Sequence, residues 1–307
     1  MEFYWSLLTL FGFRILLGLS AYVVILTGQI SMAQAGFYAI GAYTAGAATA
    51  IGGWPIVPAI LLGGVVGGGF GFLVGFPALR VRGLFLVIAT LAFTEMVRML
   101  FLNLKYTVRI GERTVGPAGA EGFRGITYYY QNGWSPVAVV AFTWGFVLLV
   151  LLGFWLMDRS RMGAVLRAVG EDELAAASVG ISLTAAKVSA MTAGGFVAGL
   201  AGGLYAHYAT YVSQEDFGVL LASFAIAYPL IGGTGSVVGP IAGVLFFSLL
   251  IDGLRFLGDW RNLLFGVLIV VMMNLRPHGI VDVGLVRRVQ LALRRPRHGR
   301  ATAYAGD

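Results

Sequence analysis

The chain has 307 residues, of which 58% are hydrophobic and 11% are charged, and its mean hydropathy is +0.85. A soluble domain carries roughly 25% charged residues on its solvated surface, so this chain has too little charge to cover itself in water. The composition predicts an all-α, polytopic membrane protein. It excludes a transmembrane barrel, whose segments of ~10 residues alternate in polarity.

The net charge is +7, and no cysteine is present. The lack of cysteine excludes disulfides, thiolate metal sites and cysteine nucleophiles. Seven of the 21 basic residues are arginines beyond Leu275. In so apolar a chain, the positive-inside rule and attraction to the lipid bilayer explain this tail better than nucleic-acid binding does. The N-terminal apolar run has no basic region and no small-residue cleavage site, which indicates a retained first span.

Eight or nine membrane spans are expected. No Asp, Glu, Lys or Arg occurs from residue 15 to residue 79, a length sufficient for about three spans of ~20 residues. Three of the expected spans are shorter than ~17 residues, so broken, re-entrant or merged helices are alternatives for them. In chain order, the expected spans are 5–26, 36–51, 55–79, 84–104, 136–157, 188–211, 218–231, 237–257 and 263–275.

The positions of the arginines predict the orientation. Arg80 and Arg82 follow the third span, the basic segment 158–187 follows the fifth, and the tail 287–307 follows the last. With alternating spans these regions share one side, which should be the cytoplasm. The expected organisation is a transmembrane domain at 1–286, with an external loop at 103–135 and a cytoplasmic loop at 158–187, followed by the cytoplasmic tail.

Glycines recur every four residues in three segments. On a helix, such a stripe lets a second helix approach closely, and flexing during a transport cycle is the alternative interpretation. The stripes comprise Gly63, Gly67, Gly71 and Gly75, then Gly195, Gly199 and Gly203, and then Gly235, Gly239 and Gly243.

Catalytic and metal-binding constellations are not apparent. The three histidines have no metal-ligand spacing, and no G-x-x-x-x-G-K loop occurs, so any ATP must be bound by another chain. Glu95 and Arg98 lie three residues apart, as do Asp252 and Arg255, which places each pair on one helical face. Mutual neutralisation and a role in a transport pathway are both open for these pairs.

Two polar segments stand out from the apolar background. Residues 28–36 carry Gln29, Ser31 and Gln34 within the uncharged stretch, where a short loop and a cavity-lining broken helix are alternatives. Residues 171–180 are predicted to form a short cytoplasmic helix with Gly180 at its C-terminal cap. Three acids occupy its first turn, where the helix dipole favours negative charge, and its alanines offer a smooth docking surface.

The second segment resembles the coupling loop of ABC importer permeases, since Ala175, Ala176 and Gly180 match its pattern, although Leu174 occupies the glutamate position. The rest of the chain, from about residue 28 to residue 280, is similar to the M-type permease of the branched-chain amino-acid family. The similarity is carried by residues 28–37, 41–45, 79–86, 89–93, 95–98, 232–236, 239–240 and 275–280.

The resemblance implies a bacterial cytoplasmic-membrane heterodimer with an H-type permease. Its other partners would be two ATPase subunits that use the ATP and a soluble binding protein that meets the loop at 103–135. The chain itself would be no enzyme and would hold no cofactor. The implied substrates are branched-chain or related amino acids, with urea, short amides or aromatic acids as alternatives.

A secondary transporter is the rival class, but no midplane acid unpaired with arginine is present to support proton coupling. The residues expected along the substrate path are Gln29, Ser31, Gln34, Tyr43, Thr44, Thr90 and Glu95. Those expected to couple the permease to the ATPase are Glu171, Asp172, Glu173, Ala175, Ala176 and Gly180.

Overall fold

The computed structural model describes residues 2–110 and 113–253 and the positions 266, 267, 270, 271, 274, 279 and 280. Most of the expected ninth span, the basic tail, Arg255 and the side chain of Asp252 lie outside the described residues. The elements are α1 (Glu2–Ile25), α2 (Gln34–Ala50), α3 (Ile56–Ala78), α4 (Leu84–Asn103), β1 (Val108–Ile110), β2 (Arg113–Pro117), η1 (Gly119–Glu121), β3 (Phe123–Arg124), α5 (Tyr128–Gln131), α6 (Pro136–Arg159), α7 (Arg161–Glu171), α8 (Glu173–Ser178), α9 (Leu183–Ala209), β4 (Tyr211–Val212), η2 (Gln214–Phe217), α10 (Val219–Gly232) and α11 (Val238–Gly253).

Apolar helices make up most of the described chain. Five of them, α1, α3, α4, α6 and α9, are long and apolar enough to cross a membrane. Helices α2, α10 and α11 have 17, 14 and 16 residues. At ~1.5 Å per residue they are shorter than the ~30 Å hydrocarbon core. The described residues confirm a helical membrane protein, but they do not confirm the count of eight or nine spans.

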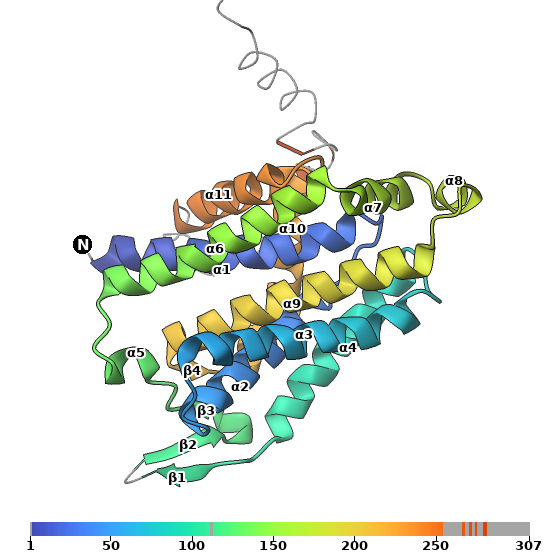
Figure 1. Ribbon diagram of the computed structural model, residues 1–307. Coiled ribbons are helices and arrows are strands. Elements are labelled where there is room, and N and C mark those ends of the chain that lie inside the picture. Colours follow the sequence, from blue (N-terminus) through green and yellow to red (C-terminus); the bar gives the residue numbers. More distant parts are fainter. Residues whose placement is uncertain are drawn as a thin grey trace, which may run out of the picture.

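Helix α9 forms the centre of the bundle and packs against α3, α2 and α1 (Figure 1). Two of the predicted glycine stripes meet where α3 and α9 run antiparallel, with Gly67 opposite Gly195 and Gly71 opposite Met191. A Cβ on Gly67 would lie only 2.6 Å from the Gly195 carbonyl oxygen. Because neither residue has a side chain, the two backbones touch, and the packing role predicted for these stripes is confirmed.

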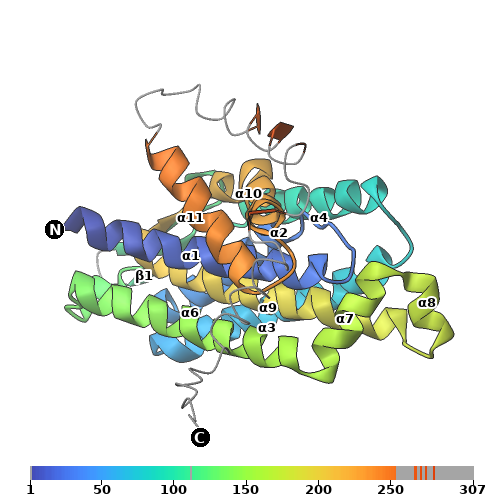
Figure 2. The ribbon, with the colours of Figure 1, turned by 90° about the horizontal axis from the view of Figure 1, so that it is seen from above.

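The hairpin of α10 and α11 packs on α1. Gly232 of α10 and Gly239 and Gly243 of α11 form its closest approach, where an added Cβ would overlap the facing backbone. Gly235, which the four-residue repeat assigns to the same stripe, lies instead in the bend before α11. Figure 2 shows α6 and α7 along one side of the bundle and α4 and α10 along the opposite side.

The expected external loop at 103–135 is folded into a cap. A four-stranded antiparallel sheet forms there, and its last strand comes from the link after α9, where Phe123 pairs with Val212. Phe123 and Ile126 are buried against Gly46 of α2. The sequence predicted an all-α fold, and the structure adds this small sheet to the helices. Its strands have two to five residues, too few for period-two alternation to reveal them in the sequence.

The bundle thus has two different ends, the sheet end with β1–β4 and the α8 end with α7 and α8 (Figure 1). Helix α9 runs from the α8 end to the sheet end. Arg82 of the α3–α4 link lies 3.5 Å from Glu173 of α8. The two described basic segments therefore share one end of the molecule, as the arginine pattern predicted.

Replacing Gly67 with Ala should lower the free energy of unfolding by about 1–3 kcal/mol, because the new methyl group meets the Gly195 backbone. Gly69→Ala on the same helix is the matched control, since a Cβ there has nothing within 4 Å. The midpoint of thermal unfolding in detergent should fall for Gly67→Ala only. Equal midpoints for the two variants would contradict the close approach of α3 and α9.

Candidate functional site

Two short helices, α7 and α8, connect α6 to α9 at the α8 end (Figure 1). Ser160 caps α7 and Asp172 caps α8 with their side-chain oxygens. The Asp172 carboxylate accepts the N–H groups of Leu174 and Ala175 at 2.8 and 3.0 Å. Gly180, with a φ of 84°, ends α8 in a Schellman motif. These local bonds define the hairpin of α7 and α8.

The helix predicted at 171–180 begins later than expected. Glu171 is the last residue of α7, and the extended backbone of Asp172, with φ −153° and ψ 109°, separates it from α8, which begins at Glu173. The Asp172 side chain competes for backbone N–H groups and so ends one helix and starts the next. The three acids therefore do not share one helical turn.

Ion pairs hold the hairpin against the rest of the chain. Glu173 accepts a hydrogen bond from Lys187 Nζ at 2.6 Å, and Arg82 approaches the same carboxylate. Because Lys187 is buried on α9, this pair ties α8 to α9. Asp158 at the end of α6 binds Arg167 of α7 at 2.8 Å. Glu173 thus serves contacts within the chain, although it was predicted to contact the ATPase.

The outer surface of α8, the α8 tip, consists of Leu174, Ala175, Ala177 and Val179. Leu174 and Val179 have 82% and 76% of their surface exposed. Ala176 was also expected on this surface but is buried, on the side where α8 contacts α7 and α9. An exposed apolar patch with so little charge indicates a docking surface.

Helix α7 connects the tip to the interior of the bundle. Its Gly170 packs against the turn that follows α1, where Gly28 has a φ of 74°. The Cβ position of Gly28 lies 3.3 Å from the Gly170 carbonyl oxygen, and a side chain at Gly170 would overlap the Leu26 backbone. The α7–α8 hairpin therefore touches the polar segment at 28–36 directly.

That segment contains non-helical backbone from residue 29 to residue 32. The Met32 N–H donates to Thr90 Oγ1 at 3.0 Å, and the Met32 carbonyl accepts from Thr94 Oγ1 at 2.8 Å. Both threonines are buried on α4. Non-helical backbone at membrane depth requires partners within the protein, and α4 supplies them. Thr94 was not predicted, because its partner lies 62 positions away in the sequence.

Three predicted path residues, Gln29, Ser31 and Gln34, are all buried in this segment. Ser31 accepts the Ala33 N–H at 3.2 Å. The Gln34 amide has no hydrogen-bond partner among the described residues, and its Nε2 lies 3.3 Å from the Cβ position of Gly194. An unpaired buried polar group costs about 1–3 kcal/mol. Gln34 thus keeps an unpaired amide in the interior of the described bundle.

The other predicted path residues lie further along α2 and α4. Tyr43 stacks on Phe101 with ring centroids 3.8 Å apart, and with Thr44 it lines a cavity of about 580 Å³ at the sheet end. Glu95 accepts a hydrogen bond from Arg98 Nε at 2.7 Å, which is the pairing that their spacing predicted. The predicted residues follow the contact of α2 with α4 and do not form a single cluster.

A family described as "Branched-chain amino acid transport system / permease component" matches residues 3–273. The chain belongs to this family. The match confirms the resemblance to branched-chain amino-acid permeases, and with it the prediction of a transport protein that is not an enzyme.

Individual relatives agree with the family match. The permease is 33% identical to the "High-affinity branched-chain amino acid transport system permease protein LivM" of Salmonella typhimurium, over 91% of its own length and 69% of the relative's. It is 32% identical to LivM of Escherichia coli K12, over 93% and 71%. The "Fructose import permease protein FrcC" of Rhizobium meliloti is 27% identical, over 83% and 72%. No solved structure matches the chain.

His207, for which the sequence analysis predicted no role, joins helices at the sheet end of the permease. The ring nitrogens of His207 lie 2.9 Å from Thr49 Oγ1 and 2.7 Å from the Gly203 carbonyl oxygen. The rings of Tyr128 and Tyr129 pack edgewise against the imidazole. His207 therefore joins α9 to α2 and α5. The sequence carries no signal for this contact, because Thr49 lies 158 positions away.

Asp216 in η2 lies beside Tyr205 of α9. Its carboxylate accepts the Ser213 N–H at 3.0 Å and a hydrogen bond from Tyr205 of α9. Partial burial raises the pKa of this carboxyl, and the bond from Ser213 opposes the rise.

Within the part of the chain that the structure describes, no group of three His, Asp or Glu side chains is placed to hold a metal ion.

Replacing Thr90 and Thr94 with Val should release the Met32 backbone, because both of its bonds to α4 are lost. Ser31 is buried, so Ser31→Cys in this cysteine-free chain should react slowly with a small thiol reagent. Adding the two Val substitutions should raise the labelling rate about 30-fold, since two lost bonds of roughly 1 kcal/mol each sum to about 2 kcal/mol. Thr192→Val, which removes a bond within α9, is the control. An unchanged rate would contradict the supporting role of α4.

Proposed function

We propose that this permease forms the membrane path of an ATP-driven importer for branched-chain amino acids in the bacterial cytoplasmic membrane. Similarity to two LivM proteins over more than nine-tenths of the chain supports this substrate class over the sugar of the more distant fructose permease. The proposed partners are an H-type permease, two ATPase subunits and a soluble binding protein. A family of transport-system components supports such an assembly.

The observation that carries the proposal is the continuous contact from the α8 tip to the buried polar segment. Two ion pairs hold the hairpin that presents the tip, and Gly170 at the end of α7 touches the Gly28 turn. Tightly packed elements transmit displacement, so a movement imposed on the tip would reach the segment at 28–36. A permease driven by a separate ATPase requires such a connection.

The substrate path is proposed to follow α2 and α4. Glu95 lies near the middle of α4, a helix of 20 residues, and the side chains of Glu95 and Arg98 remain 31% and 26% exposed. A charge at the bilayer centre costs at least about 2.5 kcal/mol, so this face of α4 should border water or a partner subunit. Gln34 supplies an unpaired amide on the neighbouring helix. Both features suit a polar solute.

The α8 end is proposed to face the cytoplasm, and the sheet end the exterior. The exposed arginines at the α8 end support this orientation by the positive-inside rule; they are Arg80, Arg82, Arg159 and Arg161. The cap formed by β1–β4 and α5 is then the surface that meets the binding protein. The C-terminus is proposed to lie in the cytoplasm as well.

Replacing Leu174 and Val179 together with Asp should prevent ATPase docking while leaving the fold intact, because both side chains are exposed. Co-purification of the ATPase and ATP-dependent uptake of labelled leucine into proteoliposomes should each fall about 30-fold, the change expected when two apolar contacts worth roughly 1 kcal/mol each are lost. Tyr130→Asp, a change at an equally exposed residue of the sheet end, should leave ATPase co-purification unchanged.

Three results of this experiment would overturn separate parts of the proposal. Normal uptake by the Leu174→Asp/Val179→Asp variant would show that the α8 tip takes no part in coupling to the ATPase. Leucine uptake by the unaltered complex without ATP would indicate a secondary transporter. ATP-dependent uptake of fructose, urea or aromatic acids in place of leucine would show that branched-chain amino acids are not the substrates.

The orientation is tested by single cysteines in the cysteine-free chain. Tyr130 and Leu174 have 79% and 82% of their surface exposed at opposite ends of the bundle. A membrane-impermeant maleimide should label Tyr130→Cys in intact cells and Leu174→Cys only after permeabilisation. The reverse pattern would show that the permease is inverted relative to this proposal.

A further inference from the structure

Glu173, the first residue of α8, faces the bundle. Helix α8 lies beside the start of α9 (Figure 1). The Glu173 carboxylate accepts a hydrogen bond from Lys187 Nζ of α9 at 2.6 Å, and only 30% of the Glu173 side chain is exposed. The next residue, Leu174, is in contrast 82% exposed. Successive residues of a helix point about 100° apart, so the acid faces α9 while the leucine faces outward.

This arrangement gives a structural meaning to the departure from the coupling-loop pattern. The pattern places its glutamate at the position of Leu174, and the acid of this chain stands one residue earlier. A displacement by one residue turns a side chain by about 100° around the helix axis. The carboxylate is thereby removed from the outer surface of α8 and brought to the contact with α9, and the α8 tip is left apolar.

The buried charge of Lys187 makes this contact specific. Lys187 is 6% exposed, and a buried ammonium is costly unless a carboxylate is paired with it. Among the carboxylates that the structure describes, only Glu173 forms a salt bridge with Lys187. Separating such a pair would leave a buried charge without a partner, which is strongly unfavourable. The pair therefore holds α8 at one position on α9.

Arg82 of the α3–α4 link adds less to this position. Its guanidinium lies 3.5 Å from the second oxygen of Glu173, and 77% of the Arg82 side chain is exposed. That carboxylate oxygen accepts no hydrogen bond within the described part of the chain. Exposed ion pairs contribute little because water screens them. The bond to Lys187 is thus the stronger of the two contacts of Glu173.

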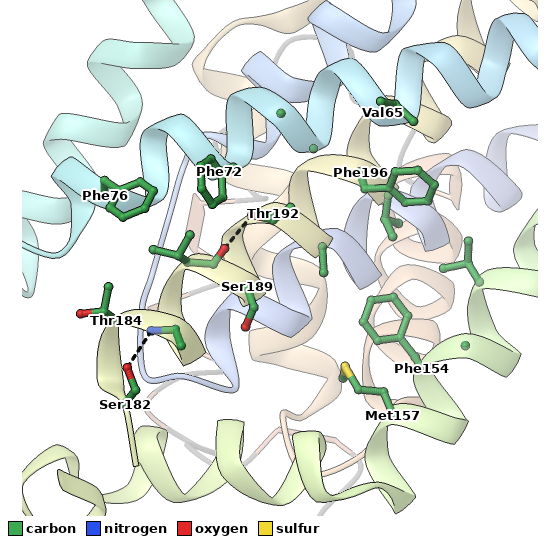
Figure 3. A pocket seen from close by; sticks show the side chains of 18 of the residues that line it. Val65, Phe72, Phe76, Phe154, Met157, Ser182, Thr184, Ser189, Thr192 and Phe196 are labelled. Carbon is green, nitrogen blue, oxygen red and sulfur yellow. Dashed lines mark hydrogen bonds between the residues drawn. The ribbon is translucent and has the colours of Figure 1, made fainter. Parts of the chain in front are cut away.

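Helix α6 stands away from the start of α9. A groove of about 1060 Å³ separates α6 from the α3–α9 pair, and its lining includes Ser182 and Thr184 at the start of α9 and Phe154 and Met157 of α6 (Figure 3). Helix α6 makes its main contact with α1. The hairpin therefore meets α9 chiefly through α7 and α8, and of the ion pairs between described residues only Glu173–Lys187 joins it to α9.

We propose that Glu173 is the positioning residue of the coupling contact, because its bond to Lys187 makes α8 and α9 move together. A displacement of the α8 tip then reaches the centre of the bundle directly. Helix α3 would follow α9, since the two backbones touch at Gly67 and Gly195. This route is separate from the contact of α7 with the turn at Gly28. The inference rests on the proposed function, in which the ATPase moves the tip.

The test compares ATP hydrolysis with leucine uptake by the full complex in proteoliposomes. Glu173→Gln and Lys187→Met each break the pair. Either change should raise the number of ATP molecules hydrolysed per leucine at least about tenfold, because loss of one partner of a buried pair strongly favours its separation. Arg82→Gln is the matched control, and its ratio should stay within about twofold of the unaltered complex, as expected for an exposed ion pair.

Charge reversal tests the pair itself. Glu173→Lys/Lys187→Glu restores an ion pair at the same contact. Its ratio should return to within about threefold of the unaltered complex, since the repulsion that it introduces toward Arg82 is largely screened by water. If the pair only stabilised the fold, hydrolysis and uptake would fall together with the amount of folded complex, and the ratio would not change in any variant.

Three results would overturn this inference while leaving the proposed function in place. They are an unchanged ratio in Glu173→Gln and Lys187→Met, a charge-reversed complex that binds the ATPase yet stays uncoupled, and an increase in Arg82→Gln as large as that in Lys187→Met. Leucine uptake without ATP by the unaltered complex would instead overturn the proposed function, and this inference with it.

Discussion

Direct backbone contact between helices α3 and α9 is the constraint on which the other contacts of the permease depend. In a bilayer the surrounding lipid is as apolar as the helices, so burial of side chains drives association only weakly and close packing must supply the attraction. Gly67 and Gly195 provide it by bringing two backbones together without intervening side chains. Helix α2 joins this pair through Gly41, which faces Gly199. The three helices form the close-packed centre of the bundle, against which the other helices lie.

The close-packed centre explains how polar backbone is tolerated inside the bundle. Because α2 is fixed against α9, the chain leaving α1 must reach the start of α2 through residues 26–33, within the protein. The threonines of α4 satisfy that stretch at Met32, and α7 packs on its first turn through Gly170. The same stretch therefore contacts helix α4 on one side and the α7–α8 hairpin on the other. This position suits it to respond to both.

Three surfaces of the chain expose groups that the rest of the described chain does not cover, and each has a different chemistry. The α8 tip is apolar in a position outside the expected membrane region, the middle of α4 carries a partly exposed ion pair, and a groove of about 1060 Å³ between α6 and the α3–α9 pair is lined mostly by apolar side chains. A single chain does not cover any of them. We propose a protein partner for the first of these surfaces and a polar path for the second.

The sequence by itself determined the features that local pattern encodes. Uncharged runs identified a helical membrane protein, glycine spacing identified helix faces suited to close packing, and three-residue spacing identified the Glu95–Arg98 pair, because each depends on neighbours within a few turns. Which helices pack together on those faces was not predicted. Distributed motifs identified the family. Only the tertiary structure decided which distant segments meet. Its contacts are the strand after α9 that completes the sheet, the bonds between Met32 and the threonines at 90 and 94, and the contact of His207 with Thr49. It also decided that Ala176 turns inward while Leu174 faces out, since packing against α7 and α9 fixes the rotation of α8. Such contacts join residues that lie tens to hundreds of positions apart, and no local periodicity records which of them will meet.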